Sequence, residues 1–424
     1  MSIAVTPVTA PPAQVGRVVT PAGIEVWHVE SHVVPLVALS FLVEGGAAQD
    51  PEGKAGVAQM TARLLDEGAG PYASSEFHER LADKAIELSF TAGADSLGGS
   101  LKTLTRHADD AFELLRLALA EPRFHDTDIE RVRAQTMAGL RYQMKDPGAQ
   151  ATRRFFAEAF PGHPYGTPTA GTLETLPGIG RDDLVAIHRA QVARERLRVV
   201  VVGAIDADEV ARRVDHAFGG LPQTPQLVAT PAVSLSGIGD RHVVEVDVPQ
   251  SVIRFAVNGL AWKDPDFLPA YVLNHVLGGG AFTSRLFQEV REKRGLAYSV
   301  GTSLATFRAT AMTWGFTATK NERVEEALEV IGGEIDRLRE EGPGDEELAK
   351  AKAYLTGSYA LGFDTSTKIA NQLVQLAFND LGVDYVARRN ALVSAVTAED
   401  VRRAGARMLG DGRLLTVIAG KPEL

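Results

Sequence analysis

The chain carries one sequence pattern twice, 214 residues apart. Residues 34–52 (VPLVALSFLVEGGAAQDPE) align without a gap on residues 248–266 (VPQSVIRFAVNGLAWKDPD), with eight identities in nineteen positions. In each copy an apolar, β-rich run, typical of a strand, leads through a polar turn into a helical stretch, at residues 53–67 and 266–277. Solenoid repeats span about 20–50 residues, so this period is far too long for one. The sequence therefore predicts two copies of a single domain.

The two halves also end alike. A helical stretch with a polar start, at residues 182–193 and 399–409, precedes an apolar run at residues 199–202 and 414–418, and a glycine ends each run. Strands that alternate with helices predict, in each half, a sheet covered by helices.

A segment rich in Pro, Gly, Ser and Thr separates the halves. Residues 219–240, GGLPQTPQLVATPAVSLSGIGD, show no hydrophobic period, which is typical of a linker. We therefore expect a flexible N-terminal arm at residues 1–14, a first domain at 15–218, this linker, and a second domain at 241–424.

The first twenty residues do not have the pattern of a signal peptide. They contain Pro7, Pro11 and Pro12 and lack both a basic start and a continuous apolar core. No run of the sequence reaches the roughly 18 apolar residues of a membrane helix, so we expect no membrane span. The expected location is the cytoplasm, or the periplasm if a signal peptide was removed before the numbering begins.

Composition excludes several kinds of chemistry. The chain has no cysteine, which excludes disulfides, thiolate zinc sites and thiol nucleophiles. Its formal net charge is −10, and Lys and Arg are spread along the chain without a long basic tract. The sequence therefore gives no electrostatic reason to expect a nucleic-acid partner.

One predicted helix resembles a known metal site whose ligands have been replaced. Residues 56–65, GVAQMTARLL, follow a strand and an Asp-Pro turn, and this stretch resembles the site helix of the pitrilysin zinc peptidases, the family of insulinase and the mitochondrial processing peptidase. That family has His-x-x-Glu-His here, because two His at i and i+4 grip one Zn²⁺ and the Glu activates its water. The matching positions are Gln59, Ala62 and Arg63.

The resemblance also implies a third ligand, a Glu on a helix about 76 positions further on. The candidate positions are Ala138 and Gly139, neither of which binds metal. Since a Gln, two small residues and an Arg cannot make a zinc site, we expect no cofactor in this chain. The resemblance covers nearly everything from about residue 15. It implies an α+β fold of two homologous sandwich domains, each a mostly antiparallel sheet covered by helices.

A second motif resembles the part of the family's active site that needs no metal of its own. Residues 277–298, LGGGAFTSRLFQEVREKRGLAY, resemble the second-half segment in which an Arg and a Tyr reach across a cavity to the zinc, and the match falls on Arg291 and Tyr298. A Tyr hydroxyl can stabilise the oxyanion of peptide hydrolysis, and an Arg fork can hold substrate carbonyls. The alternative is structural: a charge run on a solvated helix face, and a Tyr at the start of a strand.

Three other patterns have simpler explanations. The glycines at 278–280 lack the Lys-Ser/Thr of a phosphate loop, so we expect a helix end or a close backbone approach. His28 and His32 lie in a strand-like context, where residues four apart are roughly 13 Å apart, too far for one ion. An edge strand around residues 86–92 matches one that pairs with peptides in the family, but Ser89 replaces its usual Asn.

These residues suggest a partner-dependent role. The first hypothesis is a non-catalytic subunit of a heteromeric zinc metallopeptidase, inactive alone, which completes a chamber for unfolded peptides and supplies Arg291 and Tyr298 to a zinc-bearing homologous partner. The alternative is a structural or peptide-binding scaffold of the same fold with no part in hydrolysis. An active zinc enzyme with unusual ligands would instead carry stoichiometric zinc.

Overall fold

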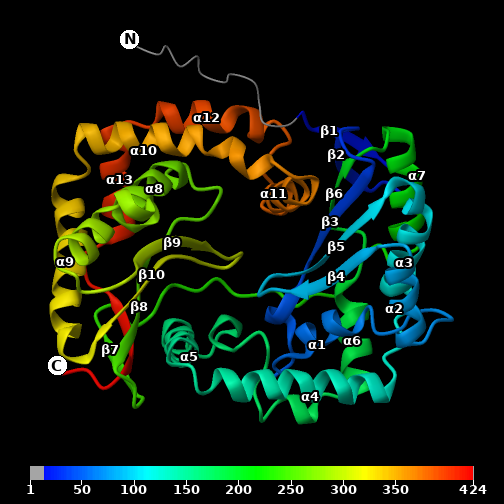
Figure 1. The fold of residues 1–424 in the computed structure, drawn as a ribbon, viewed down its shortest axis with the longest axis horizontal. Helices are drawn as coiled ribbons and strands as arrows, with labels where there is room; N and C mark the ends of the chain where they lie inside the picture. Colours follow the sequence, from blue (N-terminus) through cyan, green and yellow to red (C-terminus); the bar gives the residue numbers. More distant parts are fainter. Residues whose placement is uncertain (1–13, 424) are drawn as a thin grey trace.

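The computed structural model describes residues 14–423, which form two mixed sheets, each flanked by helices (Figure 1). The predicted arm at residues 1–14 therefore lies, apart from Gln14, outside the described residues. The first sheet has the order β1 (Gly16–Val19), β2 (Glu25–Glu30), β6 (Arg198–Gly203), β3 (Leu36–Glu44), β5 (Ser96–Leu104), β4 (Glu87–Ala92). The second has the order β7 (Arg241–Glu245), β11 (Leu415–Gly420), β8 (Gln250–Asn258), β10 (Ala311–Lys320), β9 (Val300–Thr306).

Helices surround both sheets. Those of the first half are α1 (Val57–Leu64), α2 (Ser74–Asp83), α3 (Ala108–Ala120), α4 (Asp126–Gln143), α5 (Pro147–Ala159), α6 (Arg181–Gln191) and α7 (Ala207–Phe218). Those of the second half are α8 (Phe267–Asn274), α9 (Val324–Glu341), α10 (Asp345–Gly357), α11 (Ser366–Phe378), α12 (Tyr385–Ala395) and α13 (Ala398–Leu409). Two π-helical segments, η5 (His275–Gly279) and η7 (Phe287–Glu292), belong to the second half.

The topology confirms the duplication. Strands β3 and β8 have equivalent bounds after the shift of 214 residues, and each lies third from one edge of its sheet. In both sheets the last strand of the half, β6 or β11, pairs in parallel on one side and antiparallel on the other, while the remaining pairs are antiparallel. The predicted α+β fold with mostly antiparallel sheets is thus confirmed.

The central strands of each sheet are buried on both faces, and one covering helix comes from the other half of the chain. One face of the first sheet packs on the helices of its own half, whereas its other face, with Trp27 and Leu42, packs on Phe363 and the residues of α11. Reciprocally, α5 of the first half packs with Phe155 against Met312 and neighbouring residues of the second sheet. The two halves therefore exchange α5 and α11, and the predicted domain boundaries do not describe how the two cores are closed.

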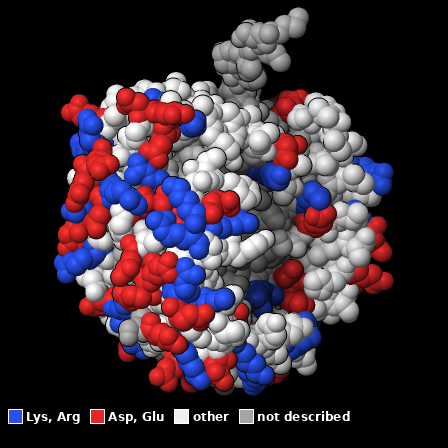
Figure 2. All heavy atoms as spheres, turned by 60° about the vertical axis from the view of Figure 1, so that its left-hand side comes forward, with Lys and Arg blue, Asp and Glu red and all other residues white. Residues whose placement is uncertain are grey.

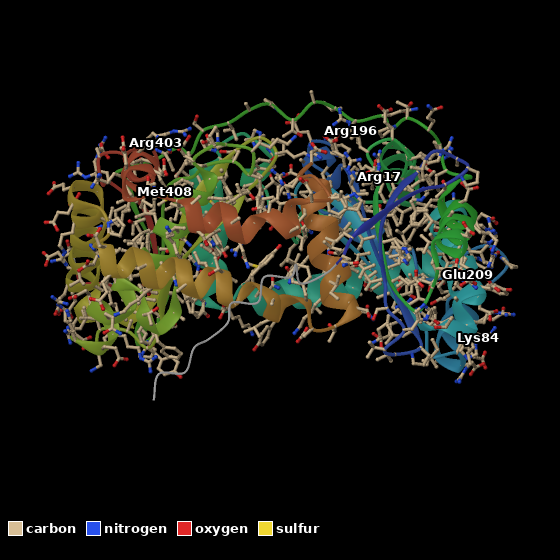
Figure 3. All side chains as sticks on the ribbon, turned by 90° about the horizontal axis from the view of Figure 1, so that it is seen from above. Arg17, Lys84, Arg196, Glu209, Arg403 and Met408 are labelled. Carbon is tan, nitrogen blue, oxygen red and sulfur yellow. The ribbon has the colours of Figure 1, made fainter. Side chains whose placement is uncertain are left out.

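The linker is held along its length. Residues 219–240, all within the described part of the chain, form neither helix nor strand. The Gln49 side chain makes two hydrogen bonds to the backbone of Val228. Its Nε2 donates to the Val228 carbonyl (2.9 Å), and its Oε1 accepts from the Val228 amide (2.8 Å). Val233 N–H donates to the carbonyl of Ala309 in the second half (3.1 Å). Figure 3 shows this segment running along one side of the molecule, past Arg196.

The remaining sequence predictions can be compared element by element. The helices expected at 53–67, 182–193 and 399–409 correspond to α1, α6 and α13, and the one expected at 266–277 is divided between α8 and η5. Within residues 14–423, no helix combines the length and apolar character that a bilayer crossing requires. Positive and negative side chains are interspersed over the face shown in Figure 2, which is hollowed between the halves.

Candidate functional site

Helix α1, which carries the positions of the predicted zinc motif, is capped at its start by the carboxylate of Asp50. Asp50 accepts hydrogen bonds from the amides of Gly56 (2.7 Å) and Ala58 (2.9 Å), so it satisfies amides of the first turn that lack helical partners. Gly56 has φ +98°, a conformation that glycine adopts without strain. Burial raises the pKa of Asp50 to about 6, although the amide hydrogen bonds oppose this rise.

The three positions of the predicted zinc motif make no metal site. Gln59 uses its Oε1 to accept from the amide of Ala92 at the end of β4 (3.3 Å). Ala62 is fully buried, with no polar atom on its side chain. Arg63 is exposed, and its Nη1 donates to Thr136 Oγ1 on α4 (3.2 Å). A guanidinium in this place brings a permanent positive charge where the family holds a cation, so the residues do not fit zinc.

The candidate positions of the third ligand follow Thr136 on α4 by two and three residues. Ala138 and Gly139 are both exposed, and a Cβ added to Gly139 would meet nothing within 4 Å. Thr136, which the sequence did not single out, is the residue of α4 that hydrogen-bonds to α1. No chemistry can be derived from a metal at this site.

The two histidines near the N-terminus do not form a pair. His28 lies on β2, is buried, and makes a hydrogen bond through Nε2 to the carbonyl of Ile205 (3.0 Å). His32 lies beyond the strand and contacts Glu30 (2.8 Å). Across residues 14–423, no cluster of three or more His, Asp and Glu residues could hold a metal ion.

Arg291 and Tyr298 are brought together in the second half. Arg291 lies on η7, with its guanidinium carbon 4.7 Å from the ring centroid of Phe287 and 5.0 Å from that of Tyr298. Both distances are typical of cation–π contacts. Among the described residues, the carboxylate within ion-pair distance of Arg291 is that of Glu292, 3.7 Å away. The Tyr298 side chain is 84% exposed, so its hydroxyl is open to solvent.

The turn between the two residues is fixed by backbone contacts. Gly295 has φ +59° and donates to the carbonyl of Arg291 (2.9 Å), while Leu296 N–H donates to Val290 (2.8 Å). The following residues are anchored to β10, because Thr319 donates to the carbonyl of Leu296 (2.6 Å). The chain is therefore folded back after η7, and this reversal places the Tyr298 ring beside Arg291.

The charges that surround this pair neutralise one another. Glu289 binds Lys293 and Arg294 at once, with Arg294 Nη1 2.6 Å from its Oε2. These two cations hold the pKa of Glu289 below its ordinary value. Arg285 is engaged elsewhere, in a bidentate pair with Glu347. Of the basic side chains in this segment, Arg291 is thus held mainly by aromatic rings.

The glycine run allows a close backbone approach, as predicted. A Cβ on Gly278 would lie 2.6 Å from Thr302 Oγ1 and 2.7 Å from Thr302 N of β9. A π-helical segment replaces the last turn of α8 here; such segments are frequent at functional sites. Phe282, two residues after the last glycine, is exposed and packs edge-on against Phe287 at 5.0 Å between ring centroids.

The predicted edge strand is present. Strand β4 forms one edge of the first sheet, and Ser89 Oγ lies 3.0 Å from Ser100 Oγ of the neighbouring strand. Gln59 of helix α1 accepts a hydrogen bond from the Ala92 amide. The outward-facing N–H at the end of β4 is therefore already bonded and is not available to a peptide.

Two features of the site region were not predicted. Phe287 supports Arg291 from the preceding turn, which the i, i+4 spacing of the sequence could have indicated. The second feature is a contact between the halves. Asp95 accepts hydrogen bonds from the Tyr165 hydroxyl (2.5 Å) and from the Arg308 amide (2.9 Å). The Tyr165 hydroxyl in turn accepts a hydrogen bond from the Ala309 amide (3.1 Å). No local pattern identifies such a contact, because its members are far apart in sequence.

Comparison with known proteins agrees with this arrangement. The model of the insulinase family (peptidase family M16) matches residues 26–173, and that of the peptidase M16 inactive domain matches residues 178–355. The chain is 27% identical over 352 residues to the non-peptidase homologue YmxG of Helicobacter pylori, covering 82% of this chain and 81% of that protein. It is also 27% identical over 351 residues to the uncharacterized zinc protease SCO5738 of Streptomyces coelicolor, covering 81% and 71% of the two chains.

A solved structure extends the similarity to the whole fold. The crystal structure of a peptidase M16 inactive domain from Pseudomonas fluorescens superposes with a TM-score of 0.91 and 26% identity, covering 97% of this chain and 98% of that one. The family resemblance inferred from the two motifs is therefore confirmed. The chain belongs to the insulinase (M16) peptidase family and is an inactive homologue within it.

Proposed function

We propose that this chain is the non-catalytic subunit of a heteromeric zinc metallopeptidase and supplies Arg291 and Tyr298 to the zinc site of a homologous partner. One observation carries the proposal: the two side chains stand together at the surface, 5.0 Å apart between guanidinium and ring, in a chain whose own site helix has Gln59, Ala62 and Arg63 in place of metal ligands.

The chemistry of the pair suits peptide hydrolysis. Attack on a peptide bond develops negative charge on the carbonyl oxygen, and the Tyr298 hydroxyl would donate to it. Loss of one such donor typically raises the barrier by about 2–4 kcal/mol. Arg291, which contacts the rings of Phe287 and Tyr298, would hold neighbouring substrate carbonyls with its N–H groups.

The partner supplies what this chain lacks. A homologous subunit with an intact His-x-x-Glu-His helix would hold the zinc and the general base, and the two chains would enclose unfolded peptides. In this arrangement the first domain (15–218) contributes chamber wall and the second (241–424) contributes the catalytic pair. Alone, the chain is expected to cleave nothing.

The test is reconstitution with such a partner. Peptide cleavage by the complex is measured for the wild type, Arg291→Ala, Tyr298→Phe and the control Arg294→Ala. Arg294 is a neighbouring arginine engaged with Glu289, so its loss should leave kcat nearly unchanged. Tyr298→Phe should lower kcat by roughly 10²-fold or more, with assembly of the complex unaffected.

Two results would reject the proposal. If both variants cleave like the wild type in an active complex, the pair is not used in catalysis. If the chain binds peptides but no zinc-bearing homologue activates it, a scaffold role explains it better. Stoichiometric zinc in the purified chain, measured by atomic emission, would contradict the premise that its own site is inactive.

A further inference from the structure

The four sheet edges of the described structure differ in how they are protected. Free edges invite pairing with other chains, and proteins commonly protect them with charges, short strands or covering groups. Strand β1 has only four residues, with Arg17 paired to Glu25. Strand β7 begins and ends with charges, Arg241 and Glu245. Strand β4 carries Glu87, paired with Lys102 at 2.6 Å, and its last amide is bound by Gln59.

Strand β9 lacks the charges and the shortness that protect the other three edges, and only its first residues are covered. Its sequence, VGTSLAT over Val300–Thr306, contains no charged residue and no proline. It forms the outer edge of the second sheet and pairs with β10 in a regular antiparallel register without a bulge. At seven residues it is also longer than β1, β4 or β7.

The hairpin that ends β9 determines which of its backbone groups point outward. Phe307 N–H donates to the carbonyl of Thr310 across the turn (2.8 Å). In an antiparallel pair, bonded and non-bonded positions alternate along the strand. Ala305 is therefore bonded to β10, whereas the amide and carbonyl groups of Leu304 and Thr306 face away from the sheet. Within residues 14–423, no hydrogen bond joins these outward groups to another residue.

The other end of the strand is covered and adjoins the candidate site. Gly278 packs against Thr302, where even a Cβ would be too close, so the open stretch begins after Thr302. Tyr298 lies two residues before the strand starts. On β10, Phe316 pairs in register with Gly301, in the covered part of the strand, and is 38% exposed. Strand β9 lies on the side of its sheet that faces the interior between the halves (Figure 1).

We propose that the outer edge of β9 binds an extended peptide as an added strand and leads its backbone toward Arg291 and Tyr298. Paired amide and carbonyl groups at strand spacing recognise another extended backbone independently of its side chains. The absence of charge on β9 favours uncharged segments. That the occupant is a substrate rests on the proposed function, but the binding itself is measurable on the isolated chain.

The test separates backbone from side-chain recognition. The probe is a fluorescent, acetylated and amidated peptide of about eight residues of Thr, Val and Ser, long enough to span the strand. Its anisotropy is titrated with the wild type, Leu304→Ala and Leu304→Pro. Alanine keeps the outward N–H, whereas proline removes it and is tolerated on edge strands where that N–H faces outward. Leu304→Pro should weaken binding about tenfold and Leu304→Ala less than about threefold.

A second measurement does not depend on the variants. The same peptide methylated on every backbone nitrogen keeps its side chains but loses its donors, and it should not bind. Equal affinity of the methylated peptide, equal effects of alanine and proline, or no binding by the wild type would each overturn the proposal. So would a homodimer that Leu304→Pro dissociates, because the edge would then belong to a second copy. Failure here leaves the cleavage test of Arg291 and Tyr298 intact.

Discussion

Arg291 and Tyr298, seven residues apart in sequence, are in direct contact, with the guanidinium carbon of the first 5.0 Å from the ring centroid of the second. The reversal at Gly295 and the anchoring of Leu296 to Thr319 produce this contact before any partner is present. A pair already assembled loses less conformational entropy when it engages a substrate, which is the general advantage of preorganisation.

Removal of the Arg291 side chain should affect stability only modestly. It makes one cation–π contact with the buried ring of Phe287 and one with the exposed ring of Tyr298, and such a contact contributes about 0.5–1 kcal/mol when partly exposed. We expect Arg291→Ala, which removes both contacts, to lower the free energy of unfolding in urea by no more than about 2 kcal/mol. A much larger loss would mean that Arg291 is structural, and a decrease in cleavage could not then be assigned to chemistry.

The glycine run should be sensitive to a single methyl group. Gly278→Ala would place a Cβ 2.6 Å from Thr302 Oγ1, and such overpacking typically costs about 1–3 kcal/mol. The matched control is Gly332→Ala in α9, where a Cβ meets nothing within 4 Å. That change should stabilise by about 0.5–1 kcal/mol, since glycine is unfavourable inside a helix. Denaturant unfolding of both variants measures the difference.

Asp50 should make stability depend on pH. Because burial raises its pKa from 3.8 to about 6, the folded protein keeps a proton between these values that the unfolded chain releases. Stability from this group is therefore present at low pH and falls as the pH rises through this window. Asp50→Asn removes the titration but also loses one of the two amide contacts.

The informative quantity is the difference in unfolding free energy between Asp50→Asn and the wild type, measured as a function of pH. Relative to the wild type, Asp50→Asn should gain about 1–2 kcal/mol in unfolding free energy between pH 4 and pH 7. A constant difference across that range would show that Asp50 is ionised throughout and that its amide hydrogen bonds outweigh its burial.

The hydroxyl of Tyr165 should contribute to the contact between the halves. Tyr165→Phe removes a donor to Asp95 and an acceptor for the Ala309 amide, which should cost about 1–3 kcal/mol. Tyr142→Phe is the control, because Tyr142 is highly exposed. Equal effects of the two changes in urea unfolding would show that the Tyr165 contact contributes nothing measurable.

The sequence predicted those strands, helices and site residues that depend on local patterns or on the internal repeat. The match of residues 34–52 with 248–266 located β3 and β8, and the polar starts of the last helices located α6 and α13. The Arg-x₆-Tyr spacing named two residues that do meet, although their role stays a proposal.

What the sequence did not predict depends on contacts between distant segments. The amphipathic pattern of α5 indicates an apolar face, with Phe155, but not which sheet receives it. Thr136 on α4 could not be recognised as the contact of Arg63 because nothing in either local sequence specifies the distance between the two helices. The free edge of β9 likewise follows from strand order, which is a property of the whole second half.

The exchange of α5 and α11 has a consequence for anyone who divides this protein. A protease cut within residues 219–240 would not release two independent units, because each fragment would retain a helix that closes the core of the other. The fragments would remain bound through those helices, and either one expressed alone would present an apolar sheet face to water. The two halves are held together by the burial of α5 and α11 against each other's sheets, rather than by the covalent linker between them.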